Sequence, residues 1–332
     1  MRTTSNLSRA GRLVSLGALA LGASVALASG VSAAASSAST TPVKITSQSQ
    51  LTTLLQQGAS ATALPTVVDP PASLATSFTN TKFCLLNQNL SDPVDARPVD
   101  SQCSWGDLNA KKTVVLFGDS QAGMWVNAFD TLGKADHFKV VLYANAACDI
   151  ASTELWNYYS LAGSQGCTAF KSWALKRFET LKPAAIVAIY HPSVTSYNYL
   201  KLSISPLVYS TALTSTFKQL SQASKDVIVV SDIPNMDREP ATCLSIHANA
   251  INVCGVAASV GTSDEDIPTE SAAASAAGVH FVNTSAWYCT SSFCPVEANH
   301  TILYFDEYHL TKYYTAELEP LLAQVLAKNG LS

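Results

Sequence analysis

From residue 113 onward, the chain alternates compact apolar runs with longer segments of helical period. Each apolar run is bounded by glycine, proline or polar residues, as is typical of strands buried on both faces of a parallel sheet. Alternation of such strands with helices predicts a parallel sheet covered by helices on both faces. The predicted strands are residues 113–117, 138–143, 184–190, 226–231 and 279–282, and the predicted helices are residues 122–133, 168–181, 207–224 and 311–327.

Residues 1–33 have the pattern of a secretory signal peptide. Three arginines precede an apolar stretch that runs from residue 13 to about 28, and small residues at 31–33 offer a cleavage site. The alternative is a retained membrane anchor, but glycine and serine interrupt the stretch, and it is short for a spanning helix. We therefore expect cleavage, release into the extracellular or cell-wall space, and no stable membrane insertion once the signal is removed.

Residues 34–80 differ in composition from the rest of the chain. They begin with a run rich in Ser, Thr and Ala, which predicts a flexible leader. Residues 47–57 predict one short helix within this leader, and prolines at 65, 70 and 71 end the pattern. We therefore place the folded domain at residues 81–332 and expect a disulfide to hold its irregular N-terminal lead-in.

Composition narrows the function classes. Only 13% of the 332 residues are charged, and the net charge is −4. A mildly acidic chain without a basic run gives no electrostatic reason to expect nucleic-acid binding. Hydrophobic residues make up 48% of the chain, but alanine supplies many of them. No segment after the signal has the length and apolar character of a membrane span.

Eight cysteines predict a disulfide framework. An even number in an exported chain favours disulfides, although eight cysteines allow 105 pairings. They fall into four sequential couples that each enclose a short segment, so we expect each couple to be bonded. Zinc binding by the cysteines is the weaker alternative, because no CxxC pair occurs. A metal at Asp232 and Asp237 is also a weaker interpretation than two solvated loop carboxylates. The expected disulfides are Cys84–Cys103, Cys148–Cys167, Cys243–Cys254 and Cys289–Cys294.

Gly118-Asp119-Ser120 follows the first predicted strand directly. Ligands of a parallel sheet bind at the carboxyl ends of its strands. A serine at a strand-to-helix turn presents its hydroxyl there, near backbone N–H groups that can face an oxyanion. Ser120 is therefore a candidate nucleophile, although this is not the GxSxG elbow of the α/β-hydrolases. The alternative is that Ser120 only caps the following helix.

Asp306 and His309 lie just before the last predicted helix. A serine nucleophile needs a base, and the base needs an acceptor that orients it. Because the two residues are three apart, one turn can bring them together, with His309 as the base and Asp306 as its partner. The alternative is an ordinary helix start, with an acidic first turn and Thr311 as the cap. Both interpretations can hold together.

These two motifs together resemble those of the SGNH (GDSL-like) hydrolase superfamily, and more closely those of the SGNH domains fused to acyltransferase-3 membrane proteins. TVVLFGDSQAGMW looks like their first block and CTSSFCPVEANHTILYFDEYHLT like their last, and the likeness spans about residues 50–328. The resemblance implies a flavodoxin-like three-layer α/β/α fold around a central parallel sheet. It also implies Ser120 as nucleophile, His309 as base and Asp306 as its partner, without a metal or organic cofactor.

The chain departs from the superfamily pattern at the residues that stabilise an oxyanion. The pattern has a glycine after the second strand and an asparagine after the third, whereas this chain has ANAAC at 144–148 and YHPS at 190–193. We expect the backbone of Ala147, and the side chain of His191 or Asn198, to take over these roles. Gln121, directly after the candidate nucleophile, is a further candidate contact whose role the sequence leaves open.

The sequence therefore predicts a secreted serine esterase or acyl transferase. The resemblance implies an acyl ester of a glycan as the substrate, and we expect a short acyl chain such as acetyl and an acyl-Ser120 intermediate. Two alternatives remain open. One is a non-catalytic glycan- or cell-wall-binding protein that kept the fold, as the missing Gly and Asn would allow. The other is an exported partner of a membrane acyltransferase.

Overall fold

The computed structural model of the chain describes residues 42–66, 68, 79, 81, 83–86, 100–153, 155, 161–192, 203–262 and 266–331. All of them belong to one unit of the chain, Ser39–Ser332. The predicted signal peptide and Asn198 lie outside the described residues, so these two assignments stay predictions.

A sheet with the strand order β1-β4-β3-β5-β6-β8 forms the centre of the described chain, and all of these neighbours are parallel. A further strand, β2, pairs antiparallel with β4. The predicted parallel sheet is therefore confirmed. The sequence did not predict β1 or the antiparallel strand β2. The strands are β1 (Leu85–Leu86), β2 (Ser104–Gly106), β3 (Lys112–Gly118), β4 (Phe138–Asn145), β5 (Ala185–Ile189), β6 (Asp226–Val230) and β8 (His280–Val282).

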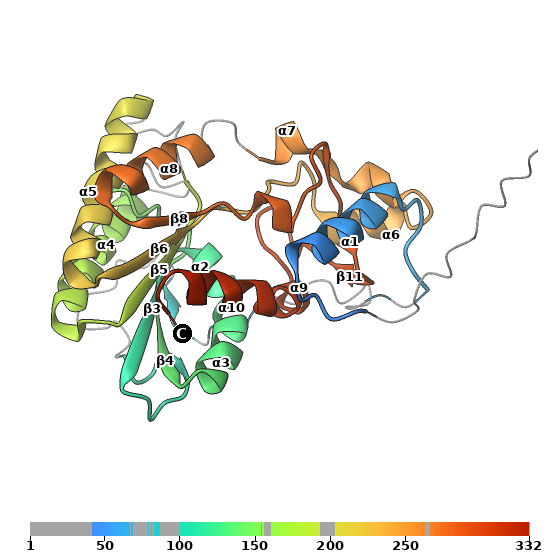
Figure 1. Ribbon diagram of the computed structural model, residues 1–332. Coiled ribbons are helices and arrows are strands. Elements are labelled where there is room, and N and C mark those ends of the chain that lie inside the picture. The colour runs from blue at the N-terminus through green and yellow to red at the C-terminus, as the bar shows by residue number, and fades with distance from the viewer. Residues whose placement is uncertain are drawn as a thin grey trace, which may run out of the picture. The chain divides into compact units, whose positions relative to one another are not determined.

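The central strands are buried on both faces, because helices cover both sides of the sheet (Figure 1). Along β3, Val114 and Leu116 pack into one hydrophobic cluster, while Val115 and Phe117 pack into the other. This confirms the three-layer α/β/α arrangement that the resemblance implied. The first face carries α2 (Ser120–Met124), α3 (Val126–Ala135), α9 (Lys312–Glu317) and α10 (Glu319–Lys328), and the second carries α4 (Leu161–Leu181), α5 (Pro206–Ala223) and α8 (Asp266–Ala277).

Two of the predicted helices are each divided in two. The helix predicted at 122–133 consists of α2 and α3, which meet at Trp125, and the helix predicted at 311–327 consists of α9 and α10, which meet at Leu318. Pro320 explains the second break, because proline has no N–H to bond to the preceding turn and its ring crowds that turn's carbonyl.

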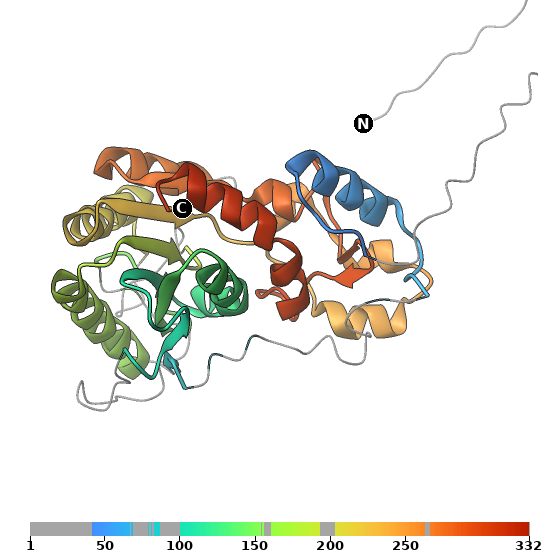
Figure 2. The ribbon, with the colours of Figure 1, turned by 60° about the horizontal axis from the view of Figure 1, so that its bottom comes forward.

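A segment that the sequence assigned to a flexible leader is packed in the structure. The predicted short helix is present as α1 (Gln48–Ser60), which buries Leu51 and Leu55. It contacts β10 (Glu297–Ala298), which belongs to the last part of the chain, and Figures 1 and 2 show it in blue beside that region. The leader is therefore not flexible throughout, because an apolar face of α1 is removed from water here.

The remaining elements of the described chain are short. Strand β10 pairs antiparallel with β11, and β7 pairs antiparallel with β9. They form a region apart from the main sheet, and its buried apolar residues continue the cluster on the α2 and α3 face. These elements are α6 (Pro240–Ile246), η3 (Ile251–Cys254), β7 (Val256–Ala257), α7 (Ala258–Gly261), η4 (Ser285–Trp287), β9 (Phe293–Cys294) and β11 (Thr301–Ile302).

All four predicted disulfides are present: Cys84–Cys103, Cys148–Cys167, Cys243–Cys254 and Cys289–Cys294. The first joins the residues that precede β1 and β2, so it holds the predicted lead-in against β4. Disulfides persist in oxidising compartments, which agrees with an exported domain. Within the described ranges, no helix combines the length and the apolar composition needed to cross a membrane.

If α1 belongs to the folded unit, Leu55→Ala should destabilise the whole domain. Leu55 is fully buried, so loss of its side chain should lower the free energy of unfolding by about 2–5 kcal/mol. Gln56→Ala, at an exposed position of the same helix, is the matched control and should change it by less than about 0.5 kcal/mol. Denaturant titration followed by tryptophan fluorescence measures both. Equal stabilities would show that α1 does not contribute to the folded state.

Candidate active site

The serine of the Gly-Asp-Ser sequence lies at the carboxyl end of β3. Gly118 is the last residue of the strand, and a Cβ atom there would lie 1.8 Å from the carbonyl oxygen of Ile189 on β5. Only glycine therefore allows the two strands to approach this closely. Asp119 caps α2, because its Oδ1 accepts the N–H of Gln121 at 2.8 Å. Ser120 is thus the first residue of α2, at the ligand-binding edge of the sheet.

A closed loop over residues 304–310 carries the predicted histidine and aspartate. Tyr304 and Leu310 form an antiparallel bridge at its base. Inside the loop, Asp306 Oδ1 accepts the N–H of Tyr308 at 2.8 Å. From outside, Gln121 Nε2 donates to the carbonyl oxygen of Tyr308 at 2.6 Å. The helix that begins with the candidate nucleophile is therefore bonded directly to the loop that carries the candidate base.

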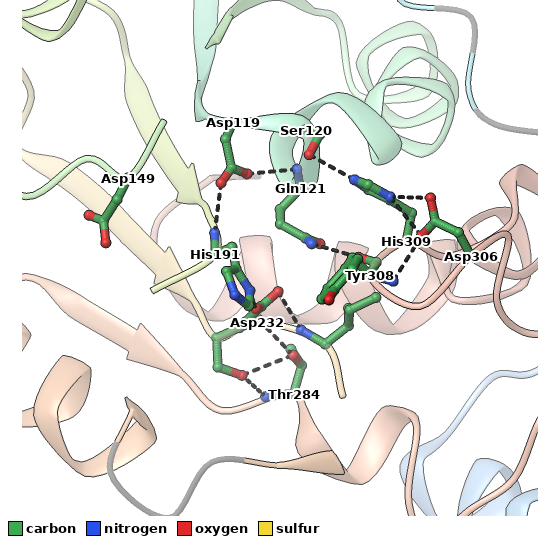
Figure 3. A network of polar contacts seen from close by, with 12 residues as sticks. Asp119, Ser120, Gln121, Asp149, His191, Asp232, Thr284, Asp306, Tyr308 and His309 are labelled. Carbon is green, nitrogen blue, oxygen red and sulfur yellow. Dashed lines mark hydrogen bonds and ion pairs between the residues drawn. The ribbon is translucent and has the colours of Figure 1, made fainter. Parts of the chain in front are cut away.

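Ser120, His309 and Asp306 form a continuous chain of hydrogen bonds (Figure 3). Ser120 Oγ lies 2.7 Å from His309 Nε2, and Nδ1 of the same ring lies 2.8 Å from each carboxylate oxygen of Asp306. Because a carboxylate only accepts, Nδ1 carries the proton, and the Nε2 lone pair accepts the serine hydroxyl. The structure thus brings together the three residues that the sequence predicted. This arrangement can remove a proton from a serine that attacks a carbonyl group.

The carboxylate of Asp119 joins the nucleophile turn to the neighbouring strand. In addition to the N–H of Gln121, it accepts the N–H of His191 just beyond β5, at 3.0 Å from Oδ2. Asp119 is only 1% exposed. Burial raises its pKa to about 6, although the two backbone donors oppose this rise. A buried carboxylate that is ionised at neutral pH therefore holds α2 and the end of β5 together.

His191 forms a second histidine–carboxylate pair next to the first. Its Nδ1–H donates to Oδ2 of Asp232, and Oδ1 of the same carboxylate accepts the N–H of Ile233 at 2.8 Å. This corrects the interpretation of Asp232 as a solvated loop carboxylate. The pairing of the strands brings the two residues together: Ile189 lies opposite Val230 on β6, and each partner follows its strand residue by two positions.

The surrounding charges favour the protonated form of His191. Burial alone would lower the pKa of an imidazolium, but the nearby carboxylates of Asp232, Asp119 and Asp266 outweigh it and raise the pKa of His191 to about 9. The side chain of His191 is 38% exposed, and its ring lies edge-on to the ring of Tyr308, with 6.1 Å between the ring centres. At neutral pH the site therefore holds an imidazolium that is accessible from solvent.

The other predicted contacts have different placements. Gln121 is 2% exposed, and its side-chain amide bonds to the loop over residues 304–310, so it connects α2 to that loop. Ala147 lies just after β4, at the same edge of the sheet as the nucleophile, because Ala144 on β4 lies opposite Gly118. Its φ is 45°, a left-handed conformation that favours glycine.

In the described part of the chain, no group of three or more His, Cys, Asp or Glu residues could hold a metal ion.

Asp119 should make the stability of the domain depend on pH. Its pKa of about 6 in the folded chain lies above that of an unfolded aspartate, so its contribution is full below about pH 4 and is lost as the pH rises through 6. We compare the free energy of unfolding of the wild type with that of Asp119→Asn. The difference, wild type minus variant, should fall by about 3 kcal/mol as the pH rises from 4 to 7. Denaturant titrations across this range measure it. A difference independent of pH would contradict the burial of an ionised carboxylate here.

Comparison with known proteins agrees with this fold. A search of curated proteins finds no match. The structure is similar to the periplasmic domain of a lipopolysaccharide acetyltransferase from Salmonella ser. Paratyphi A, with a TM-score of 0.51, 14% identity, and coverage of 66% of this chain and 85% of that one. An inhibitor-bound aryl esterase from M. smegmatis matches with a TM-score of 0.43, 15% identity, and coverage of 66% and 99%.

A family model described as "SGNH domain (fused to AT3 domains)" matches residues 84–324, which is more than half of the chain. The resemblance that the Gly-Asp-Ser and Asp-x-x-His sequences indicated is thereby confirmed. The chain belongs to the SGNH domain family.

Proposed function

We propose that this chain is a serine esterase or acyl transferase that acts on acyl esters through an acyl-Ser120 intermediate. The observation that carries the proposal is the unbroken chain of hydrogen bonds from Ser120 through His309 to Asp306. Membership of the SGNH family and the position of Ser120 at the carboxyl edge of the sheet support it.

In the first half of the reaction, His309 Nε2 takes the hydroxyl proton as Ser120 Oγ attacks the ester carbonyl. Asp306 stabilises the imidazolium that forms and keeps the ring in the required orientation. His309 then returns the proton to the departing alcohol oxygen, and the acyl group stays on Ser120. In the second half, His309 takes a proton from water or from a sugar hydroxyl as that oxygen attacks the acyl group, and it returns the proton to Ser120 Oγ as the bond between the acyl group and Oγ breaks. Hydrolysis and transfer differ only in this acceptor.

The tetrahedral intermediates carry a negatively charged oxygen, which needs hydrogen-bond donors in fixed positions. The N–H of Gln121 already donates to Asp119, so it is committed to the cap of α2. We assign one donor role to the backbone of Ala147, at the end of β4. Its φ of 45° supports this role, because non-glycine residues in strained backbone conformations concentrate at active sites.

Acetyl esters of glycans outside the cytoplasm are the substrates that we propose. The four disulfides fit an oxidising compartment, and the similar periplasmic domain belongs to a protein named as a lipopolysaccharide acetyltransferase. Tyr308 is 50% exposed beside the two histidines, so its ring can pack against a sugar. Because the matched family is described as fused to AT3 domains, a membrane acyltransferase is the partner that we propose for the transfer reaction.

Removal of the triad should abolish ester turnover. With purified, oxidised residues 34–332, release of p-nitrophenol from p-nitrophenyl acetate should fall to background in Ser120→Ala and His309→Ala. Asp306→Asn should lower kcat by about 10³–10⁴-fold, because the imidazole then loses the carboxylate that sets its tautomer. Ser245 lies in α6 and His247 directly follows it, and both are exposed. Ser245→Ala and His247→Ala are therefore matched controls that should keep full activity.

Equal, weak rates in the wild type and all three triad variants would contradict the serine mechanism. That result, together with specific binding of glycans that Ser120→Ala leaves unchanged, would instead establish a binding protein with this fold.

A further inference from the structure

The pair formed by His191 and Asp232 has no part in the proton transfers described above, yet it is bonded to the turn that carries the nucleophile. The backbone N–H of His191 donates to the carboxylate of Asp119, the residue directly before Ser120. The strands below them are paired, with Gly118 opposite Ile189. His191 is therefore fixed at the same edge of the sheet as the nucleophile.

The orientation of the His191 ring is determined by Asp232. Nδ1 bonds to that carboxylate, and no described residue forms a hydrogen bond with Nε2. The side chain is 38% exposed. In Figure 3 the ring lies between Asp119 and Asp232, on the side of α2 where the Tyr308 side chain is found. Nε2 is thus the ring nitrogen that remains for a ligand in the site.

Asp232 is itself held rigidly. The N–H of Ile233 donates to its Oδ1 at 2.8 Å. The residue before it, Ser231, donates its N–H to the carbonyl oxygen of Val282 at 2.9 Å, and its Oγ accepts the N–H of Thr284 at 2.9 Å. These bonds connect the end of β6 to the end of β8. The carboxylate therefore offers a fixed acceptor, and the imidazole bonded to it is fixed as well.

The charges around His191 decide whether it acts as a base or as a donor. Carboxylates face it from four elements: Asp232 after β6, Asp119 after β3, Asp266 at the start of α8 and, more weakly, the buried Asp149 after β4. From the loop over residues 304–310, the ring of Tyr308 lies edge-on to the imidazole. With a pKa of about 9, the imidazole is already protonated at neutral pH, so it cannot accept the proton of an attacking hydroxyl, but it can donate from Nε2.

From this geometry we propose that His191, held by Asp232, is the side-chain hydrogen-bond donor that stabilises the oxyanion formed when Ser120 attacks the ester. The role rests on the serine mechanism proposed above. His191 is then a catalytic residue and Asp232 a positioning residue. Nε2–H donates a hydrogen bond to the negative oxygen and keeps its proton, which leaves the proton transfers of His309 unchanged.

Deprotonation of His191 should slow the reaction in alkaline solution. When His191 loses a proton, Asp232 still accepts the hydrogen on Nδ1, so Nε2 is left with a lone pair that repels an oxyanion. The wild type should therefore lose kcat toward p-nitrophenyl acetate as the pH rises through about 9. Asp232→Asn removes the nearest negative charge and should move this decline to lower pH by about 1–3 units.

Two substitutions of the histidine complete the test. His191→Phe should lower kcat by about 100- to 1,000-fold, the usual cost of one lost oxyanion donor, with little change in KM. His191→Gln keeps a donor that does not titrate, so its residual rate should show no decline near pH 9. Circular dichroism at each pH checks that every variant stays folded. His137 and Asp107 form another histidine–carboxylate pair, with 3.2 Å between His137 Nδ1 and Asp107 Oδ2. His137→Gln and Asp107→Asn are therefore matched controls, and each should show the same dependence of kcat on pH as the wild type.

A kcat of His191→Phe within about threefold of the wild type, or an alkaline decline that Asp232→Asn does not move, would overturn the proposal. Ser120→Ala, measured alongside, separates this failure from failure of the serine mechanism. If Ser120→Ala is inactive while the His191 and Asp232 variants behave like the wild type, only the donor role is wrong. If Ser120→Ala retains turnover, the serine mechanism itself is wrong.

Discussion

The carboxylate of Asp119 accepts hydrogen bonds from two elements that the chain separates by some seventy residues, the start of α2 and the residue after β5. Gly118 makes this contact possible, because any side chain there would push β5 away. Once the two elements are joined, the nucleophile turn, the loop bonded to Gln121 and the imidazole of His191 all take positions around one point. The cost is a buried charge, visible in the raised pKa of Asp119.

The site contains two histidine–carboxylate pairs with the same local pattern, in which Nδ1 bonds to a carboxylate and Nε2 faces the reacting group or solvent. Their different surroundings suit them to different tasks. His309 has Ser120 as a hydroxyl donor at Nε2, so its ring is placed to accept a proton. His191 is surrounded by carboxylates from several elements, which keep it charged. An imidazolium can replace an amide side chain as the donor to an oxyanion, because both present an N–H group.

The sequence was most informative where burial on both faces imposed a continuous apolar run. β3, β4, β5 and β6 are such strands and were predicted, whereas β1 and β2 are too short for a pattern and depend on β4 and a disulfide. Helix α8 is rich in alanine and serine without an apolar stripe, so it was missed. The triad could be predicted because its members flank recognisable elements. The pairing of His191 with Asp232 depends on which strands are neighbours, and the order of strands in a sheet cannot be read from their order in the chain.

The most direct test of this account is to identify the residue that carries the acyl group. The wild-type protein would be mixed with p-nitrophenyl acetate, quenched in acid within the first turnover, digested and analysed by mass spectrometry, with Ser120→Ala treated in the same way. We expect one acetyl group on Ser120 and none at this position in the variant. Release of p-nitrophenol without acetylation of Ser120, or with the acetyl group on another residue, would contradict it.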